Sequence, residues 1–563
     1  MRQKICFLLV LLVGSWAMAG ESRMLVRIYM EEPEHVAALD DMHLDFASLA
    51  VTDHADVVVT TLELTEIERR GFQTEIMQYE ADVLVPPEYH TVDQTWAVLD
   101  SLHQLYPTIT ELDTLGFSQR FGLPIPHFII SQNVGTREDE PAALINGMHH
   151  AREPIGNEIC LFTMKRILED YPDSAYAQRF VDSMEVHFVP IVNPEGWKYV
   201  TDSSLSSPWW RKNLRDNANN GGPIDPNYDG VDLNRNYDWR WTEGGSSSPS
   251  SWVYRGPSPA SESEIQALVS LSTERKFVVG LSYHSFGYDV LFPWAYGGQY
   301  TPDLTALFEI AQNLAWEIGN YSVGPLDGTN MSSVWFYGAL GMYDFLIETA
   351  YSFIPPAESI IVETEKNFRG LKYLLNRSFY SGIAGHVLDS LTLEPLEATL
   401  EVIGLTGDSI VPRTSDSLFG RFYRLLQNWT YEMRFSRPGY TTKTISNISV
   451  VSDSLTYIEV LLAQVPGVES GDMTQHFDVH SGALPNPFRG HCIISVGSIG
   501  DTPARLSIYD TAGRLVRSLA CGPKGAYLWD GRDDIGRRVE PGVYFYRAEN
   551  KGGYVLGKVV MVR

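Results

Sequence analysis

The stretch that decides the fold of this chain is Ala143-Leu-Ile-Asn-Gly-Met-His-His-Ala-Arg-Glu-Pro-Ile155. Its apolar start predicts a buried strand that breaks at Gly147, and a helical pattern follows. His150 and Glu153 lie three residues apart at the exit from the strand, so both side chains can point the same way. An imidazole and a carboxylate there can fill two of the three protein positions of a catalytic zinc. A surface histidine beside a glutamate that favours the helix dipole would show the same spacing, so the pair alone leaves both interpretations open.

Four later segments extend this pattern. They are a second apolar strand that ends in a histidine, a Trp-Arg-Lys sequence, a loop with Asp-Leu-Asn-Arg, and an apolar run that closes on a glutamate: Val278-Val-Gly-Leu-Ser-Tyr-His284, Trp210-Arg-Lys-Asn213, Gly230-Val-Asp-Leu-Asn-Arg-Asn236 and Phe345-Leu-Ile-Glu348. In their order along the chain, the five segments resemble the carboxypeptidase A-like family of zinc metallocarboxypeptidases. The resemblance covers roughly residues 88–378 and is specific, because five ordered motifs rarely coincide by chance.

The resemblance implies a site for one zinc ion. Its ligands would be His150, Glu153 and His284, and a fourth position would stay open for water. His149 is the obvious rival of His150, but the spacing to Glu153 and the family's His-x-x-Glu pattern favour His150. Asp232 aligns with a carboxylate that orients a zinc histidine; its alternative interpretation is a surface turn residue.

The resemblance also assigns catalytic and substrate-binding residues. Glu348 would be the general base, and its apolar setting would raise its pKa toward a useful value. Arg211 would stabilise the oxyanion of the tetrahedral intermediate. Asn234 and Arg235 match the pair that binds a terminal carboxylate, for which a guanidinium fork is suited. Arg152 would contact the substrate further from the scissile bond. Without the other motifs, Glu348 would be interpreted as a strand-end glutamate in solvent, and Asn234 and Arg235 as a polar loop with an ordinary surface ion pair.

The sequence departs from the family pattern at the substrate pocket. The family's mobile tyrosine, which closes over the substrate, is Leu326 in this register, and Tyr321 lies nearby but out of register. The position expected at the floor of the specificity pocket falls near Ser333, which is neither acidic nor large. We therefore expect neutral or aromatic C-terminal residues in the substrate, with the tyrosine's role vacant or filled from elsewhere.

Composition and the N-terminus limit the environment and partners of the protein. The formal net charge of −27 argues against nucleic acid and anionic membranes as partners. A basic start, an apolar core and Ala17-Met-Ala19 predict a secretory signal cleaved after Ala19; a membrane anchor is the alternative. No second apolar run has transmembrane length, so we expect a soluble protein that is extracellular or periplasmic, with the cell surface as a further location.

At 563 residues the chain should hold about three or four domains. Strands that alternate with helices predict an α/β catalytic domain with a mixed, mainly parallel sheet. Before it we expect a small α+β domain, which resembles a prosegment or serves as a permanent structural domain. After it, alternating short strands predict two β-sandwiches, which resemble a transthyretin-like domain and a FlgD-like immunoglobulin-type module, the latter either a surface-attachment or secretion module or a plain spacer. The expected boundaries are 1–19, signal; 20–84, α+β domain; 85–378, catalytic domain; 379–464, transthyretin-like sandwich; 465–482, linker; and 483–563, FlgD-like sandwich.

Three cysteines would remain after removal of the signal. Cys160 lies in the helix after the first motif and should be a small buried hydrophobe. Cys492 and Cys521 share the last predicted domain and could pair in an oxidising compartment.

The sequence thus predicts a secreted zinc carboxypeptidase that acts on peptides or proteins with a free C-terminal carboxylate. Two alternatives stay open. One is a zinc amidase or deacylase that acts on cell-wall peptides or small acyl amino acids, suggested by the missing tyrosine. The other is a catalytically inactive surface binding protein on the same scaffold, against which the intact set of ligands and base argues.

Overall fold

The structure is a computed structural model, and it describes residues 23–30, 39, 42, 44–48, 54–202, 207–295, 299–326, 328–405, 410–465, 481–484, 488–496, 505–510, 514–519, 526–550 and 553–562. The predicted signal, residues 1–19, lies outside these ranges. The chain forms two compact units, Met1–Val465 and Pro466–Arg563. Each is described by itself below.

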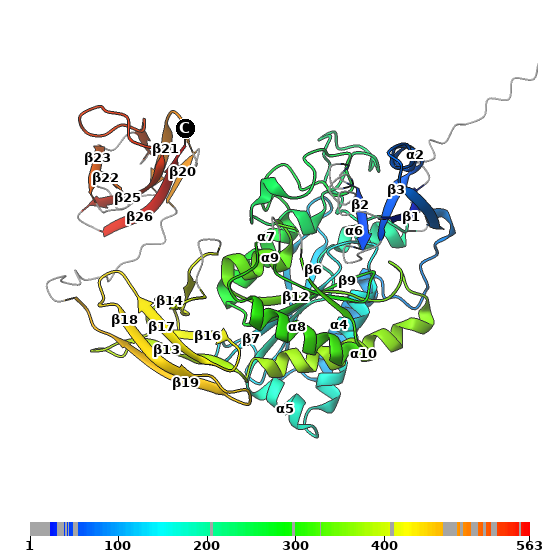
Figure 1. The fold of residues 1–563 in the computed structure, drawn as a ribbon, viewed down its shortest axis with the longest axis horizontal. Coiled ribbons are helices and arrows are strands. Elements are labelled where there is room, and N and C mark those ends of the chain that lie inside the picture. Colours follow the sequence, from blue (N-terminus) through cyan, green and yellow to red (C-terminus); the bar gives the residue numbers. More distant parts are fainter. Residues whose placement is uncertain are drawn as a thin grey trace, which may run out of the picture. The chain divides into compact units, whose positions relative to one another are not determined.

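A small antiparallel sheet in the order β2-β3-β1-β4 opens the first unit (Figure 1). Strand β3 leads directly into helix α2, which begins with a capping box between Thr60 and Glu63. The elements are β1 (Arg23–Tyr29), β2 (Asp45–Ser48), β3 (His54–Thr60), α2 (Thr61–Arg69), β4 (Gln73–Tyr79) and the short helix η1 (Glu80–Asp82). These elements combine an antiparallel sheet with a helix, while the bounds of the expected α+β domain, 20–84, stay a prediction.

An eight-stranded mixed sheet forms the centre of the first unit, in the order β11-β10-β12-β9-β7-β8-β6-β5. The four middle strands, β12, β9, β7 and β8, are parallel to one another. Their residues are almost entirely buried, as expected for a sheet covered on both faces. The strands are β5 (Thr110–Phe117), β6 (Pro124–Ile130), β7 (Ala142–Gly147), β8 (Glu185–Val189), β9 (Val279–His284), β10 (Asp289–Phe292), β11 (Ser322–Pro325) and β12 (Tyr343–Glu348).

Helices pack around this sheet (Figure 1). Helix α3 begins with the capping box that Thr91 and Gln94 predict. The helices are α3 (Val92–Leu105), α4 (Ile155–Asp170), α5 (Ala175–Asp182), α6 (Pro194–Thr201), α7 (Ser263–Arg275), α8 (Leu304–Ile318), α9 (Ser332–Trp335) and α10 (Ala357–Arg377), with the short turns η2 (Leu233–Arg235), η3 (Trp241–Glu243) and η5 (Phe336–Leu340). Within the described ranges, no helix has both the length and the apolar character needed to cross a bilayer.

Two small sheets follow helix α10 and share one apolar core. Their orders are β16-β13-β19 and β15-β14-β17-β18. The strands are β13 (Gly382–Asp389), β14 (Thr399–Val402), β15 (Arg413–Thr414), β16 (Arg421–Leu425), β17 (Thr430–Ser436), β18 (Lys443–Ser449) and β19 (Leu455–Leu462). We call residues 382–465 the first sandwich.

The second unit is also all β, with sheets in the orders β20-β21-β24 and β23-β22-β25-β26 around a core that includes Trp529. Cys492 is buried in this core, whereas Cys521 lies outside the described residues, so their pairing stays a prediction. The strands are β20 (Ser481–Leu484), β21 (Cys492–Val496), β22 (Arg505–Tyr509), β23 (Leu515–Leu519), β24 (Ala526–Trp529), β25 (Gly542–Asn550) and β26 (Gly553–Met561).

Candidate metal centre

The two predicted motifs meet because their strands are neighbours. Strands β7 and β9 are parallel, with Gly147 opposite Tyr283, so the turn after β7 emerges beside His284 at the end of β9. Gly147 and Gly156 let helix α4 lie close to the strand, because a Cβ atom on Gly147 would lie 3.0 Å from the carbonyl carbon of Gly156. The turn between them therefore carries its side chains directly over the carboxyl end of the sheet, where active residues gather in such folds.

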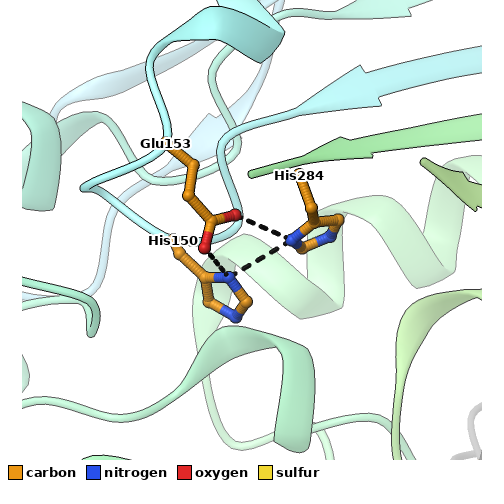
Figure 2. A group of neighbouring side chains, drawn as sticks. All are labelled: His150, Glu153 and His284. Atoms are coloured by element: carbon orange, nitrogen blue, oxygen red, sulfur yellow. Dashed lines mark hydrogen bonds and ion pairs between the residues drawn. The ribbon is translucent and has the colours of Figure 1, made fainter. Parts of the chain in front are cut away.

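His150, Glu153 and His284 converge there (Figure 2). The Nδ1 atoms of the two histidines are 3.2 Å apart, and each faces one oxygen of the Glu153 carboxylate, at 2.8 Å from His150 and 2.9 Å from His284. His149, the rival considered above, instead directs its Nε2 atom to the hydroxyl of Tyr237, at 2.8 Å.

The outer nitrogen of each ring also has a polar neighbour. His150 Nε2 lies 3.2 Å from Asp232 Oδ1, and His284 Nε2 lies 3.2 Å from the hydroxyl of Ser282. Contacts of this kind orient the ring and direct the other nitrogen toward a metal. Asp232 also accepts hydrogen bonds from Arg211 Nε and from the backbone of Asn234, which holds its carboxylate in place.

Charge and burial inside the site favour an ionised Glu153 and a neutral His284. Burial by itself would raise the pKa of Glu153, but the adjacent rings of His150 and His284 hold it well below its usual range. Burial lowers the pKa of His284, against the opposing pull of Glu153. Burial would also raise the pKa of Asp232, yet Arg211 and His150 hold it far below the usual range. An ionised Glu153 and a neutral His284 are in the protonation states that a metal ion requires of such ligands.

The donor set fits zinc. Two imidazole nitrogens and a carboxylate form one of the ligand sets of catalytic zinc, with bonds of about 2.0–2.2 Å. Ligands at that range in a tetrahedral site lie roughly 3.3 Å apart, close to the separations found here. In addition, two Nδ1 atoms 3.2 Å apart beside a carboxylate need a shared cation or protons between them.

Glu348 lies beside this group, because it ends strand β12 directly opposite His284 in the parallel register. Glu348 lines the same cleft as His150, Glu153 and His284. Its Oε2 atom is buried and has no hydrogen-bond partner among the described residues. Burial, and then the nearby charge of Glu153, raise the pKa of Glu348 well above its ordinary value.

Arg211, Asn234 and Arg235 also line the cleft. Arg211 is held through Nε, while its Nη1 atom lies 4.0 Å from Glu153. Asn234 accepts a hydrogen bond from the backbone of Ser332 at 2.8 Å, and its backbone carbonyl accepts one from Arg235. The loop that carries Asp232 therefore places Asn234 and Arg235 against the cleft, and Asp232 itself holds Arg211 there.

Arg152 has a partner that the sequence analysis did not foresee. Its guanidinium is fully buried and donates two hydrogen bonds to Asp45, at 2.5 and 2.7 Å. Asp45 begins strand β2 of the N-terminal sheet, and its neighbours Phe46 and Ala47 line the cleft itself. The predicted contact of Arg152 with substrate therefore requires that Asp45 leave first. No local sequence signal marks Asp45, because its importance depends on how two distant segments pack.

The remaining cleft wall is apolar. Leu291, Leu326, Met331 and Leu346 line it around a cavity of about 30 Å³. Leu326, which the sequence analysis aligns with the family's tyrosine, thus lines the cleft. Ser333 is buried and donates a hydrogen bond to the carboxylate of Asp344, away from the set of residues that line the cleft.

Comparison with known proteins identifies the class of this domain. Residues 95–370 match the zinc carboxypeptidase family model. They form a metallocarboxypeptidase domain of a family whose members use one zinc ion, and His150, Glu153 and His284 are its candidate ligands.

Individual relatives agree with this class. Carboxypeptidase A2 of Rattus norvegicus is 29% identical over 305 residues, which cover 51% of this chain and 69% of that protein. Metallocarboxypeptidase A of Trichophyton rubrum is also 29% identical, over 54% of this chain and 75% of its own length. Carboxypeptidase A from Helicoverpa armigera has a similar fold, with a TM-score of 0.55, 20% identity, and coverage of 63% of this chain and 97% of that one.

Proposed function

We propose that this chain is a secreted zinc carboxypeptidase that hydrolyses the C-terminal peptide bond of peptides or proteins. The observation that carries the proposal is the convergence of His150, Glu153 and His284 at the carboxyl end of the sheet, with Glu348 on the adjoining strand. A zinc ion bound there would polarise the scissile carbonyl and acidify the attacking water.

The residues of the chain supply the other parts of the reaction. Glu348 takes a proton from the attacking water and returns it to the leaving nitrogen, a role suited to a carboxylate whose pKa burial raises. Arg211 stabilises the negative charge on the former carbonyl oxygen. Asn234 and Arg235 bind the terminal carboxylate, and this makes the reaction exopeptidic.

The apolar wall of the cleft supports a preference for apolar C-terminal side chains. Leu291, Met331 and Leu346 line the cleft, whereas the acidic Asp344 does not belong to its lining and is engaged by Ser333. Burying an aliphatic or aromatic side chain there releases water from apolar surface on both partners. A cationic side chain would be left without a counter-charge.

We infer further that the N-terminal domain holds the enzyme in a latent form. Asp45 occupies Arg152 with two hydrogen bonds and lies 3.7 Å from Arg211, while Phe46 and Ala47 line the cleft. Burial would raise the pKa of Asp45, but the two arginines lower it, so the contact persists across the neutral range. A substrate and strand β2 therefore compete for the cleft and for the side chains of Arg152 and Arg211.

The direct test uses peptides that end in a free carboxylate and the same peptides with a C-terminal amide. We expect hydrolysis of the free form alone, and loss of activity with a zinc chelator. Replacement of the general base in Glu348→Gln should lower kcat by about 10²–10⁴-fold, whereas Glu358→Gln, at an exposed position of α10, should leave it unchanged. Equal cleavage of the amidated peptides would favour the amidase alternative, and full activity of Glu348→Gln would refute the mechanism. Because the N-terminal domain occupies the cleft, the assay includes chain from which it has been removed.

A further inference from the structure

A second cavity lies between the α/β domain and the first sandwich. It measures about 60 Å³ and is lined on one side by the start of strands β9 and β12 and on the other by strands β15 and β16. The candidate metal centre lies at the opposite ends of β9 and β12, which are six residues long. At about 3.3 Å per residue, roughly 17 Å separates the two sites.

Basic side chains dominate this cavity. Four cations line it, against the single carboxylate of Asp416: Lys276, Arg413, Arg421 and Arg424. Such a concentration of positive charge contrasts with the formal net charge of −27 of the whole chain.

All but one of these cations already has a carboxylate partner. Lys276 pairs with Glu397 at 3.0 Å, Arg424 with Asp303 at 2.7 Å, and Arg421 lies 3.4 Å from Asp139: each pair joins the α/β domain to the sandwich. Asp416 is engaged by Arg137. In each of these pairs the positive charge is matched by a negative one. Only the positive charge of Arg413 is not matched in this way.

Arg413 is buried, with 8% of its surface exposed, and among the described residues the carboxylate that acts on it, Asp303, already pairs with Arg424. Its Nη1 atom donates to the backbone carbonyls of Gly338 and Val411, and its guanidinium lies 4.9 Å above the ring of Tyr337. Its Nε and Nη2 atoms are buried without a hydrogen-bond partner. A buried charge with two unsatisfied donors is costly unless something binds to it.

The free atoms of Arg413 indicate what that ligand is. Nε and Nη2 form one edge of the guanidinium, and this edge binds two oxygens of one acid group. Elsewhere in this molecule, Arg23 and Arg27 use the same two atoms to grip the carboxylates of Glu80 and Asp56. A cavity of this volume holds a few water molecules, and thus an ion of only a few heavy atoms.

We propose that this cavity binds a small oxyanion, a phosphate or a short carboxylate, on the Nε–Nη2 edge of Arg413. The ion neutralises the surplus charge and ties the first sandwich to the α/β domain. This site is independent of the proposed peptidase reaction, and its test does not use catalytic activity.

The test is the thermal stability of the intact chain after exhaustive dialysis, titrated with phosphate or acetate against chloride at constant ionic strength. We expect phosphate, acetate or both to raise Tm by about 2–4 °C at saturating concentration. Arg413→Gln and Arg413→Lys should both lose this rise, because lysine keeps the charge but lacks the two-donor edge. Arg434→Gln, which removes an exposed pair with Glu401 in the same sandwich, should keep it.

The rise in Tm with phosphate, compared with the rise with acetate, shows whether the site prefers a phosphate or a carboxylate. An equal rise in wild type and Arg413→Gln would show a general salt effect and overturn the proposal, as would no response of the dialysed wild type. Should both Arg413 variants fail to fold, wild-type crystals soaked in selenate decide the matter. Anomalous density beside Nε and Nη2 supports the site, and density for water alone refutes it.

Discussion

At the scale of single residues, the buried carboxyl group of Glu264 makes the stability of the folded protein depend on pH. Glu264 is buried near Glu195 and Glu262. It accepts hydrogen bonds from the side chain of Asn213 and the backbone of Gln119. Burial, and then the two neighbouring carboxylates, raise the pKa of Glu264 to about 8. The folded protein therefore holds a proton at neutral pH that the unfolded chain, with a glutamate pKa of about 4.3, has released.

Because the folded protein holds this proton and the unfolded chain does not, the free energy of unfolding falls as pH rises. The contribution of Glu264 is fully present below pH ~4.3 and is lost as pH rises through about 8. Glu264→Gln, which mimics the protonated acid, should raise the free energy of unfolding at pH 8 by on the order of 1–3 kcal/mol relative to wild type. At pH 4, below the ordinary glutamate pKa, the two should differ little. Urea unfolding at both pH values measures this, and an identical pH dependence in the variant would contradict it.

At the scale of elements, the position of the metal ligands depends on how closely helix α4 approaches the sheet. A Cβ atom on Gly156 would lie 3.2 Å from both the Cβ and the backbone oxygen of Tyr283. Because Tyr283 directly precedes His284, and Glu153 lies one turn before Gly156, any shift there separates the two ligands. The glycine pair thus sets the geometry of the candidate metal centre.

Gly156→Ala should therefore weaken both folding and zinc binding. We expect a loss of about 1–3 kcal/mol in the free energy of unfolding from overpacking. A drop in zinc affinity, measured by competition with a chelator, should accompany it. Gly542→Ala is the matched control, because its added Cβ atom would meet no atom within 4 Å. Unchanged zinc affinity in Gly156→Ala would show that the ligands adapt independently of the helix.

At the scale of the whole molecule, the N-terminal sheet and the α/β domain are joined by buried polar contacts over the cleft. Besides the contact of Asp45 with Arg152, Glu80 accepts hydrogen bonds from Ser207 and from the backbone of Trp209. Leaving a buried arginine without its partner costs about 3–5 kcal/mol, so the docking of this domain should be sensitive to Asp45.

Cleavage of the connecting segment tests latency. Leu84 is 85% exposed between the two domains, which makes this segment a favourable site for limited proteolysis. We expect the cut chain, once freed of its N-terminal fragment, to hydrolyse peptides faster than the intact chain. Asp45→Ala should raise the activity of the intact chain roughly tenfold or more, since each 1.4 kcal/mol shifts an equilibrium tenfold. Asp82→Ala, at an exposed position of the same domain, is the control, and equal activity of cut and intact chain would refute latency.

The candidate ligands could be predicted because each one follows an apolar strand in a recognisable motif. His150, Glu153 and His284 needed only the strand ends and their spacing, and the parallel pairing of β7 and β9 then brings them together. The specificity pocket was less predictable. Ser333 turns toward Asp344, and the cleft is lined in its place by aliphatic residues of strands β10 and β12 and of the segments that follow β11 and precede α9.

By itself, the sequence determined the alternation of strands and helices and the candidates for the ligands and the base, because local periodicity and short motifs carry this information. Only the tertiary structure decided that Asp45 accepts the hydrogen bonds of Arg152, and that Nε and Nη2 of Arg413 are buried without a hydrogen-bond partner. Both depend on contacts between segments more than 70 residues apart, Asp45 with Arg152 and Arg413 with Gly338. No local pattern encodes such contacts, since burial and charge balance arise only when separate domains pack together.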